Sequence, residues 1–384
     1  MAFEFLEPVN AELQQVIHSF SDQSLSQYVR FYEGEDEIEL DNIQLAFLCV
    51  KDSRQSVYEK KSDFYFDDIR TQLYSMYVGN WEVKILDLGD IAMGDEASDT
   101  AYVFKSILSA LYKKSIVPII LGGSQDLTFY QYRAYDGIRY MVNLTSADHK
   151  FDLGNSEMPM HGQSYVGKMI IEEPYNLFNY SNLGYQSFLS PLEEIDLMDK
   201  LFFEALRLGE LKQDFTKVEP VLRDTDVLSV DIYCVKSSEI ADSNHKNING
   251  FSTFDLCKLS RYAGMSDKLS SFGIYELQAL AKSEGLVQLI SQMLWYFMEG
   301  YSLRLNEEVS EDNSHFTKYS VPIQDEVLVF LKSEVSNRWW IKIPNENNNA
   351  QKASLLACDK QDYLDATASI LPERWLKAKY KNNI

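Results

Sequence analysis

The chain has 384 residues, and its 36 lysine and arginine residues against 58 aspartates and glutamates give a formal net charge of −22. Hydrophobic residues make up 45% and aromatic residues 13% of the sequence, so the chain can bury a core and is not a disordered protein. The acidic charge disfavours nucleic-acid binding, which needs lysine and arginine against phosphates, and it also disfavours docking to an anionic membrane.

The sequence carries no sign of export. Its first residues contain no basic stretch followed by an apolar run, as a secretory signal would, and no segment reaches the roughly 18 apolar residues of a membrane span. The four cysteines are widely spaced and form no CxxC pair; they are Cys49, Cys234, Cys257 and Cys358. We therefore expect reduced thiols and a cytoplasmic protein.

Residues 1–42 are predicted to form an acidic N-terminal extension. It begins with a short helix over 11–20, after which six acidic residues fall within nine positions. These are Glu33, Glu35, Asp36, Glu37, Glu39 and Asp41. We interpret this run as a solvated loop, and the alternative is a docking patch for a basic protein partner.

Residues 43–305 alternate apolar runs with segments of helical spacing. Strands are predicted over 43–50, 83–88, 115–121, 139–146, 226–232 and 271–275, and helices over 67–77, 98–114, 190–209 and 284–299. Nearly continuous apolar runs are typical of strands that are covered on both faces. The alternation therefore predicts a three-layer α/β domain, with a mainly parallel sheet and helices on both of its faces.

The pattern changes after residue 305. Two strands, over 326–332 and 338–343, are predicted to form a hairpin, and a polar run over 345–351 follows them. The chain then continues into a last helix that ends in the basic stretch 377–381. We interpret residues 306–384 as a C-terminal appendage on the α/β domain.

Polar groups follow four of the predicted strands. The sequence reads GGSQDLT over 122–128, DHKFDLG over 148–154 and SVDIY over 229–233, and Glu276 ends the sixth strand. Ligands of open α/β sheets bind beyond the carboxyl ends of the strands, so we expect Asp148, Asp152 and Asp231 to converge there, with Asp126 and Glu276 as further candidates. Carboxylates this close repel one another and need a cation, either a metal or a protein group.

The order of these motifs resembles that of the ureohydrolases, the family of arginase, agmatinase and formimidoylglutamase. That family carries GGDHS, DAHxD and SxDxD motifs and a late glutamate, and the stretches DLGDI at 87–91 and HGQ at 161–163 are also similar to it. The resemblance covers residues 43–300 and implies the arginase/deacetylase-type fold. It further implies two Mn²⁺ ions whose bridging hydroxide attacks a guanidinium or formimino carbon, with His161 as proton shuttle and Glu276 as the grip on a cationic substrate.

Three of the six metal-ligand positions depart from the family. Asp148, Asp152 and Asp231 are kept, but Gln125 and Lys150 stand in place of histidines and Tyr233 in place of an aspartate. A protonated lysine cannot ligate a metal, and a neutral tyrosine is a poor ligand. We therefore expect at most one divalent cation, Mn in active relatives, and no other cofactor. We also expect the Lys150 ammonium to lie among the three aspartates and to replace the missing metal charge. The alternative is one residual cation with Lys150 turned outward.

Two further residues, each next to one of these ligand positions, have simpler interpretations. His149 stands where the family has a small residue and is not expected to be a ligand, and Asp126 is expected to cap the helix that follows it.

The favoured hypothesis is an arginase-fold protein that has lost binuclear manganese hydrolase activity and acts as a scaffold or regulator, through a protein partner or as a homo-oligomer. One alternative is an active formimidoylglutamase-like enzyme that cleaves a linear C–N bond of a guanidino or formimino substrate. Another is a sensor of a small guanidino or amino-acid ligand, contacted by Glu276 and His161.

Overall fold

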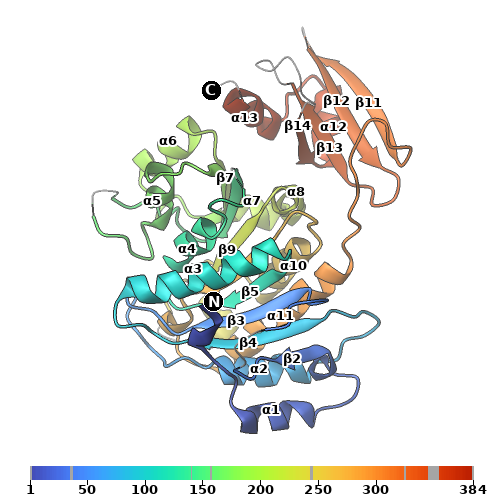
Figure 1. Cartoon of the computed structure of the whole chain (residues 1–384). Coiled ribbons are helices and arrows are strands. Elements are labelled where there is room, and N and C mark those ends of the chain that lie inside the picture. The colour runs from blue at the N-terminus through green and yellow to red at the C-terminus, as the bar shows by residue number, and fades with distance from the viewer. Residues whose placement is uncertain are drawn as a thin grey trace.

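The computed structural model describes residues 2–34, 38–139, 141–155, 158–242, 245–323, 326–344 and 354–382. Its main feature is a ten-stranded sheet in the order β1-β4-β3-β5-β10-β9-β6-β7-β8, with β2 also paired to β4 (Figure 1). The strands are β1 Leu6–Glu7, β2 Val29–Phe31, β3 Leu45–Val50, β4 Ile85–Ile91, β5 Val117–Leu121, β6 Val142–Ala147, β7 Leu177–Tyr185, β8 Glu204–Arg207, β9 Val227–Asp231 and β10 Ser271–Tyr275. Every pairing is parallel except that of β1 with β4.

Helices cover both faces of this sheet. They are α1 Ala11–His18, α2 Phe66–Ser75, α3 Ala97–Lys113, α4 Leu127–Arg133, α5 Tyr165–Ile171, α6 Leu192–Lys200, α7 Leu208–Gln213, α8 Val218–Arg223, α9 Ser237–Ile240, α10 Thr253–Gly264 and α11 Glu284–Ser302. Short 3₁₀ segments span Ala2–Phe5, Leu25–Tyr28, Phe215–Lys217, Ile232–Cys234 and Leu277–Ala279. Within the described ranges, no helix is long and apolar enough to cross a membrane.

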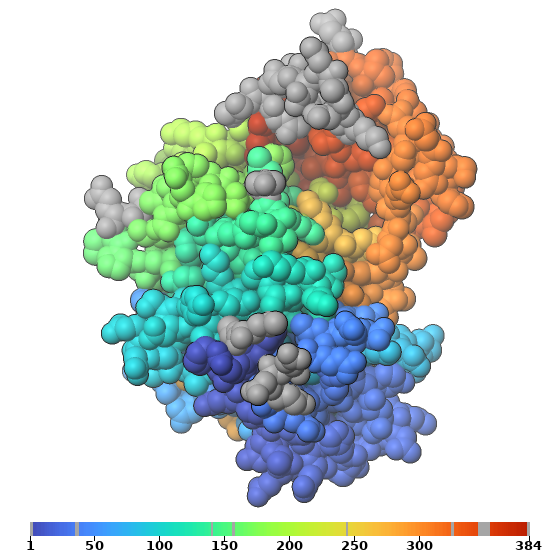
Figure 2. Space-filling model, in the orientation of Figure 1, coloured from blue at the N-terminus to red at the C-terminus, as the bar shows by residue number. Residues whose placement is uncertain are grey.

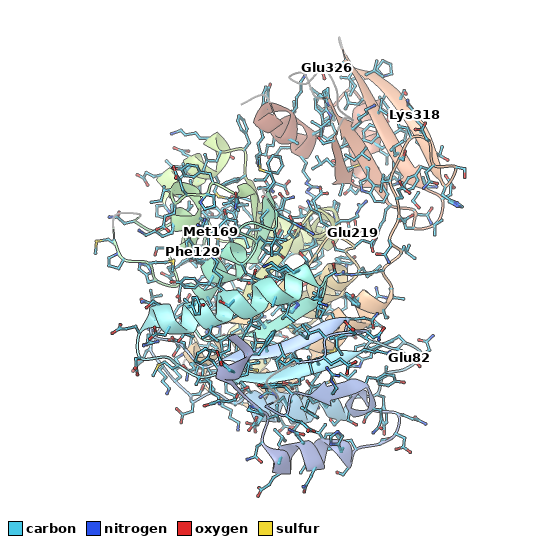
Figure 3. The ribbon with its side chains drawn as sticks, in the orientation of Figure 1. Glu82, Phe129, Met169, Glu219, Lys318 and Glu326 are labelled. Atoms are coloured by element: carbon cyan, nitrogen blue, oxygen red, sulfur yellow. The ribbon has the colours of Figure 1, made fainter. Side chains whose placement is uncertain are left out.

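The core consists of two apolar layers, one on each face of the sheet. Side chains of α2, α10 and α11 pack on one face, and side chains of α3, α4 and α5 pack on the other. Figure 3 labels Phe129 of α4 and Met169 of α5, which both belong to the second layer. Strand residues alternate between the layers, as Ile119 and Ile120 of β5 do. The predicted three-layer, mainly parallel architecture is confirmed.

A separate antiparallel sheet lies at the C-terminus, in the order β11-β12-β13-β14. Its strands are β11 Phe316–Ile323, β12 Glu326–Ser333, β13 Trp339–Ile343 and β14 Ser354–Cys358, followed by α12 Lys360–Thr367 and α13 Glu373–Asn382. The predicted hairpin corresponds to β12 and β13, and β11 and β14 were not predicted. One face of this sheet packs on α12 and α13, around the buried indole of Trp375.

The other face of the small sheet turns toward the main domain. The Arg223 guanidinium of α8 lies 4.5 Å from the centre of the Trp340 ring, and it donates hydrogen bonds to the carbonyl oxygens of Trp339 and Cys358, both at 2.8 Å. Figure 2 shows the orange and red C-terminal residues packed against the rest of the molecule. Figure 3 labels Glu219, also on α8, on the main-domain side, and Lys318 on β11.

Several boundaries differ from those predicted. The helix predicted over 190–209 ends at Lys200, Phe202 has a positive φ of 54°, and Glu204–Arg207 instead form the edge strand β8. Pairing with β7 overrides the local helical spacing there. The N-terminal segment adds β1 and β2 to the main sheet. Glu35, Asp36 and Glu37 of the acidic run, and the polar run 345–351, lie outside the described residues.

Candidate functional site

The candidate site lies beyond the carboxyl ends of four adjacent parallel strands, β5, β10, β9 and β6. Because β6 and β9 pair in register, with Ala147 opposite Val230, Asp148 and Asp231 emerge side by side. Gln125 follows β5 and Glu276 follows β10 at the same edge. All four side chains are buried, as is Asp152. The structure thus brings together the residues that the motifs singled out.

An acid–imidazole cluster forms the centre of this site. Ligand atoms of Asp148, His149 and Asp231 lie within 4.8 Å of one another, and His149 Nδ1 is 2.9 Å from Asp148 Oδ1. Burial opposes the charge of His149, but the close contact with Asp148 and the charge of that carboxylate outweigh it and raise the pKa of the imidazole. His149 was not expected among these groups. It is the second residue after β6, and its side chain is buried beside that of Asp148.

Three carboxylates of the site hold protons more tightly than exposed acids do. Burial, followed by the charge of Asp148 and a hydrogen bond to it, raises the pKa of Asp152 well above its ordinary value. Burial and Asp148 raise the pKa of Asp231 to about 7, and burial and Asp231 raise that of Glu276 to about 8. Bound protons and the imidazole of His149 therefore lower the negative charge of the cluster.

Lys150 does not lie among the aspartates, contrary to our expectation. Its backbone N–H donates to Asp148 Oδ1 at 3.1 Å, but its ammonium points to Gln163 Oε1, 3.4 Å away. Among the described residues, no carboxylate oxygen lies within ion-pair distance of this ammonium. From this position its charge still lowers the pKa of Asp152 in opposition to burial, and it does the same for the half-buried Glu194. Keeping the long side chain at the partly exposed rim avoids the cost of burying an ammonium.

Tyr233 belongs to an aromatic group at the rim. It lies in the 3₁₀ segment Ile232–Cys234, and its ring stacks on that of Tyr58 with centroids 4.1 Å apart, while the His245 ring packs edge-on at 4.4 Å. The Tyr58 hydroxyl donates to Asp231 Oδ2 at 3.4 Å and accepts from Gln163 Nε2 at 3.2 Å. Sequence reasoning missed Tyr58, because no motif marks the loop in which it lies.

Glu276 is held by protein groups on both of its oxygens. Its Oε1 accepts from the backbone N–H of Gln125 at 2.8 Å, and its Oε2 accepts from the Ser56 hydroxyl at 2.5 Å. The Gln125 amide donates to Ser229 Oγ at 2.7 Å. Within the described ranges, Gln125 Oε1 is buried without a hydrogen-bond partner. A Cβ at Gly162 would lie 2.9 Å from Glu276 Oε1, so a larger residue there would displace this carboxylate.

The other predicted residues have local roles. His161 Nδ1 accepts from the backbone N–H of Gln163 at 3.1 Å, so its ring stabilises its own turn. Asp126 does not cap α4, since its side chain makes no capping hydrogen bond, and burial raises its pKa to about 6. This expectation was wrong because the carboxylate turns back to the preceding loop and is buried there. A hydrogen bond with Ser124 in that loop opposes the effect of burial on its pKa.

Comparisons with known proteins place this geometry in context. No family model and no curated protein sequence matches the chain. Among solved structures, formiminoglutamase from Trypanosoma cruzi with Mn²⁺ superposes with a TM-score of 0.63 at 15% identity, covering 70% of this chain and 97% of that one. Formimidoylglutamase from Bacillus subtilis gives a TM-score of 0.64 at 18% identity, covering 75% of this chain and 95% of that one.

A third similar structure is that of an enzyme with a different substrate. Agmatine ureohydrolase of Thermoplasma volcanium superposes with a TM-score of 0.59 at 17% identity, covering 77% of this chain and 99% of that one. These structures are almost wholly covered, whereas about a quarter of the present chain lies outside the likeness. The chain therefore has the same fold as these ureohydrolases.

Proposed function

We propose that this chain is a ureohydrolase-fold protein that has lost binuclear manganese hydrolase activity and acts as a scaffold or regulator. One observation carries the proposal. At two of the positions where the motif comparison expects metal ligands, the Lys150 ammonium points to Gln163 and the Tyr233 ring stacks on Tyr58. Generation of a bridging hydroxide needs two ions about 3.5–4 Å apart, and the remaining donors do not suffice for a second ion.

The residues that remain suit one divalent cation at most. Asp148, His149 and Asp231 would offer two carboxylates and an imidazole, a donor set that Zn²⁺ or Mn²⁺ accepts. A cation there would displace the protons that the buried acids hold, so its affinity should rise with pH. With no second ion to share a hydroxide, we do not assign a hydrolytic step to this site.

A regulator or scaffold needs a binding surface, and exposed apolar side chains lie on the loops beside the site. Phe188 is 73% and Ile248 77% exposed. Their loops are joined where Gln186 Nε2 donates to the Asn249 carbonyl at 2.7 Å. This apolar rim supports a protein partner or a second copy of the chain as the binding partner.

Metal content and turnover test the proposal together. Purified protein is incubated with excess Mn²⁺, dialysed and analysed for metal, then assayed with formiminoglutamate, agmatine and arginine. We expect no more than one ion per chain and no release of formamide or urea. Two tightly bound Mn²⁺ ions per chain with steady turnover would contradict the proposal and establish the alternative, a formimidoylglutamase-like hydrolase of linear C–N bonds.

A gain-of-binding variant tests the same reasoning from the other side. Gln125→His, Lys150→His and Tyr233→Asp together restore the family's ligand types. We expect this triple variant to bind more Mn²⁺ than the unmodified chain. The same variant carrying Asp231→Asn is the matched control and should lose the added metal. A folded triple variant that binds no additional Mn²⁺ would show that more than these three side chains prevents binding.

A further inference from the structure

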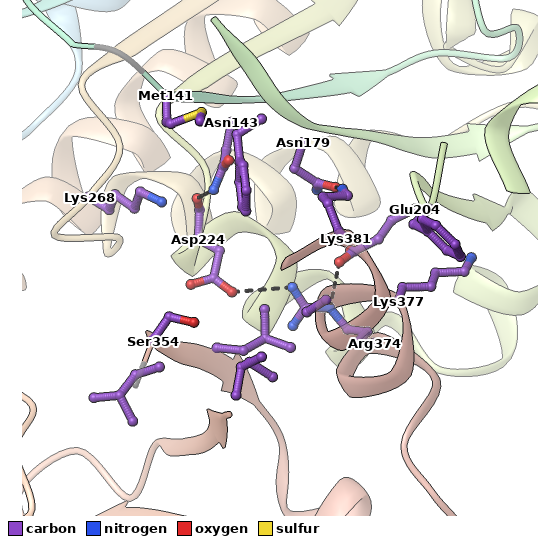
Figure 4. Close-up of a pocket in the computed structure, with 16 residues that line it drawn as sticks. Met141, Asn143, Asn179, Glu204, Asp224, Lys268, Ser354, Arg374, Lys377 and Lys381 are labelled. Carbon is purple, nitrogen blue, oxygen red and sulfur yellow. Dashed lines mark hydrogen bonds and ion pairs between the residues drawn. The ribbon is translucent and has the colours of Figure 1, made fainter. Parts of the chain in front are cut away.

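A second cavity lies at the opposite end of the strands from the candidate site. It has a volume of about 320 Å³ and lies between the start of β6, β7 and β8 on one side and β14 and α13 on the other (Figure 4). Its apolar wall consists of Met141, Phe178, Phe202, Ile343, Leu355 and Leu356. Asn143 lines this cavity near the start of β6, whereas Asp148 of the candidate site follows the end of the same strand. The two sites are therefore separate.

The residues that line this cavity include more bases than acids, although the chain as a whole is strongly acidic. Four bases line it, Lys268, Arg374, Lys377 and Lys381, against two acids, Glu204 and Asp224.

Arg374 forms ion pairs with both acids of the lining. Figure 4 shows it between Asp224 and Glu204, with dashed lines to each. Its Nε lies 3.0 Å from Glu204 Oε1 and its Nη2 lies 3.3 Å from Asp224 Oδ2. Two of the lysines have acidic neighbours outside the lining. Lys377 is 2.9 Å from Glu373 and 3.8 Å from Asp199, and Lys268 is 3.8 Å from Asp226.

Lys381 has no such neighbour. Its ammonium donates to Asn179 Oδ1 and lies 5.5 Å from the centre of the Phe178 ring and 5.0 Å from that of Phe203. Among the described residues, no carboxylate oxygen lies within ion-pair distance of it. Burial lowers its pKa to about 8; the charge of Glu204 opposes this effect and that of Lys377 adds to it. A largely buried ammonium beside aromatic rings is costly without a counter-ion.

We propose that this cavity binds a small amphipathic anion, a carboxylate or phosphate on a short apolar body, with the anionic group at Lys381 and the body against the apolar wall. Ligand pockets are commonly apolar with a few charged groups, and they occur preferentially between domains. A volume of about 320 Å³ is at the lower end of their range and holds about ten water-sized groups. The ligand supplies the counter-ion that Lys381 lacks.

Titration calorimetry with simple probes tests this site. The probes are hexanoate and hexyl phosphate, compared with acetate, inorganic phosphate and hexylammonium. We expect hexanoate or hexyl phosphate to bind once per chain, at least tenfold more tightly than the head group alone, and hexylammonium not to bind. Preference between the first two identifies the head group. Equal binding of hexylammonium, or no binding of either six-carbon anion at millimolar concentration, would overturn the proposal.

Three variants assign the binding to this cavity. Lys381→Met should weaken hexanoate binding about tenfold, since a charge-assisted contact is lost. Ala378→Phe keeps all four bases but fills the cavity from α13, and should weaken binding at least as much. Lys84→Met, at an exposed lysine just before β4, is the matched control and should leave affinity unchanged. Unchanged affinity in both cavity variants would place the anion elsewhere and refute the assignment.

Proton uptake gives an independent readout. With a pKa of about 8, the Lys381 amine of the unliganded protein is about half protonated at pH 8. An anion beside it favours the charged form. Binding should therefore take up as much as about half a proton per chain, measured in two buffers of different ionisation enthalpy. The uptake should vanish in Lys381→Met. Uptake that persists in this variant would contradict the assignment of the anionic group to Lys381.

Discussion

Replacing Asp231 by asparagine should stabilise this protein at alkaline pH. The Asp231 carboxylate is 3% exposed, and burial and the charge of Asp148 raise its pKa to about 7. The folded chain therefore retains a proton that the unfolded chain releases, and stability falls as the pH rises from about 4 to about 7. Asp231→Asn removes this titration without changing the shape of the side chain.

The magnitude follows from the pKa difference. Moving from 3.8 to about 7, at about 1.4 kcal/mol per pH unit, sets an upper bound of about 4 kcal/mol for the cost of ionised Asp231 above pH 7. At pH 5 the upper bound on this cost is about 1.6 kcal/mol, because only the interval from 3.8 to 5 contributes. The asparagine oxygen can still accept from the Tyr233 N–H, which is 2.7 Å from Asp231 Oδ1, and its amide can donate to the Tyr58 oxygen. Allowing for the lost attraction to His149, we expect a gain of about 1–3 kcal/mol at pH 8 that shrinks toward zero at pH 5.

Urea denaturation of both proteins at pH 5, 6.5 and 8, without divalent metal, measures this difference. Any substitution that removes a negative charge relieves repulsion in a chain of net charge −22, so Asp22→Asn, at an exposed carboxylate, is the control. The reasoning predicts a stability gain for Asp231→Asn that grows with pH and exceeds that of the control. An equal loss of stability at all three pH values would refute it, because a titrating buried carboxylate cannot act equally above and below its pKa.

Three further changes test other features of the fold. Lys150→Met should alter the free energy of unfolding by less than about 1 kcal/mol, because within the described ranges its ammonium hydrogen-bonds only to Gln163 Oε1; a loss of several kcal/mol in urea would contradict this placement. Arg70→Met should cost about 3–5 kcal/mol in the same assay, since the guanidinium holds buried Asp87 at 2.9 Å and Asp90 at 2.7 Å; Arg30→Met, at an exposed arginine, is the control, and a similar effect of both would contradict this. Arg223→Met should accelerate hydrogen exchange in β13 and β14, because it removes donors from the carbonyls of Trp339 and Cys358; unchanged exchange rates would show that packing alone holds the small sheet.

The strands that carry the site could be predicted because they are buried on both faces. β3 and β5 are continuous apolar runs, and their carboxyl ends are marked by glycine and polar residues. β7 and β8 escaped prediction because polar residues such as Asn179, Ser181 and Glu204 interrupt their patterns. Adjacent parallel strands have their carboxyl ends at the same edge of the sheet. This rule was enough to predict that Asp148, Asp231 and Glu276 lie close together.

The orientation of individual side chains could not be predicted in the same way. Sequence position fixes where the backbone of Lys150 lies, but its four-carbon stem can reach either the aspartates or the rim, and the cost of burying an ammonium decides between them. Tyr58 is 173 residues from Asp231 in the chain, and only the tertiary fold brings its hydroxyl to that carboxylate. His149 illustrates the same limit, since its inward turn depends on the path of the chain after β6.

The contact between α13 and β8 has a consequence for shortened forms of this protein. β8 is the outermost strand of the main sheet, and open sheet edges invite pairing with other chains. Arg374 holds Glu204 at the start of β8, and Lys377 donates to the carbonyl of the preceding residue, Phe203, at 3.2 Å. A proteolytic product that ends before α13 would retain every residue of the candidate site yet uncover this edge. Such a product should self-associate, so aggregation after limited proteolysis would report loss of the last helix rather than damage to the candidate site.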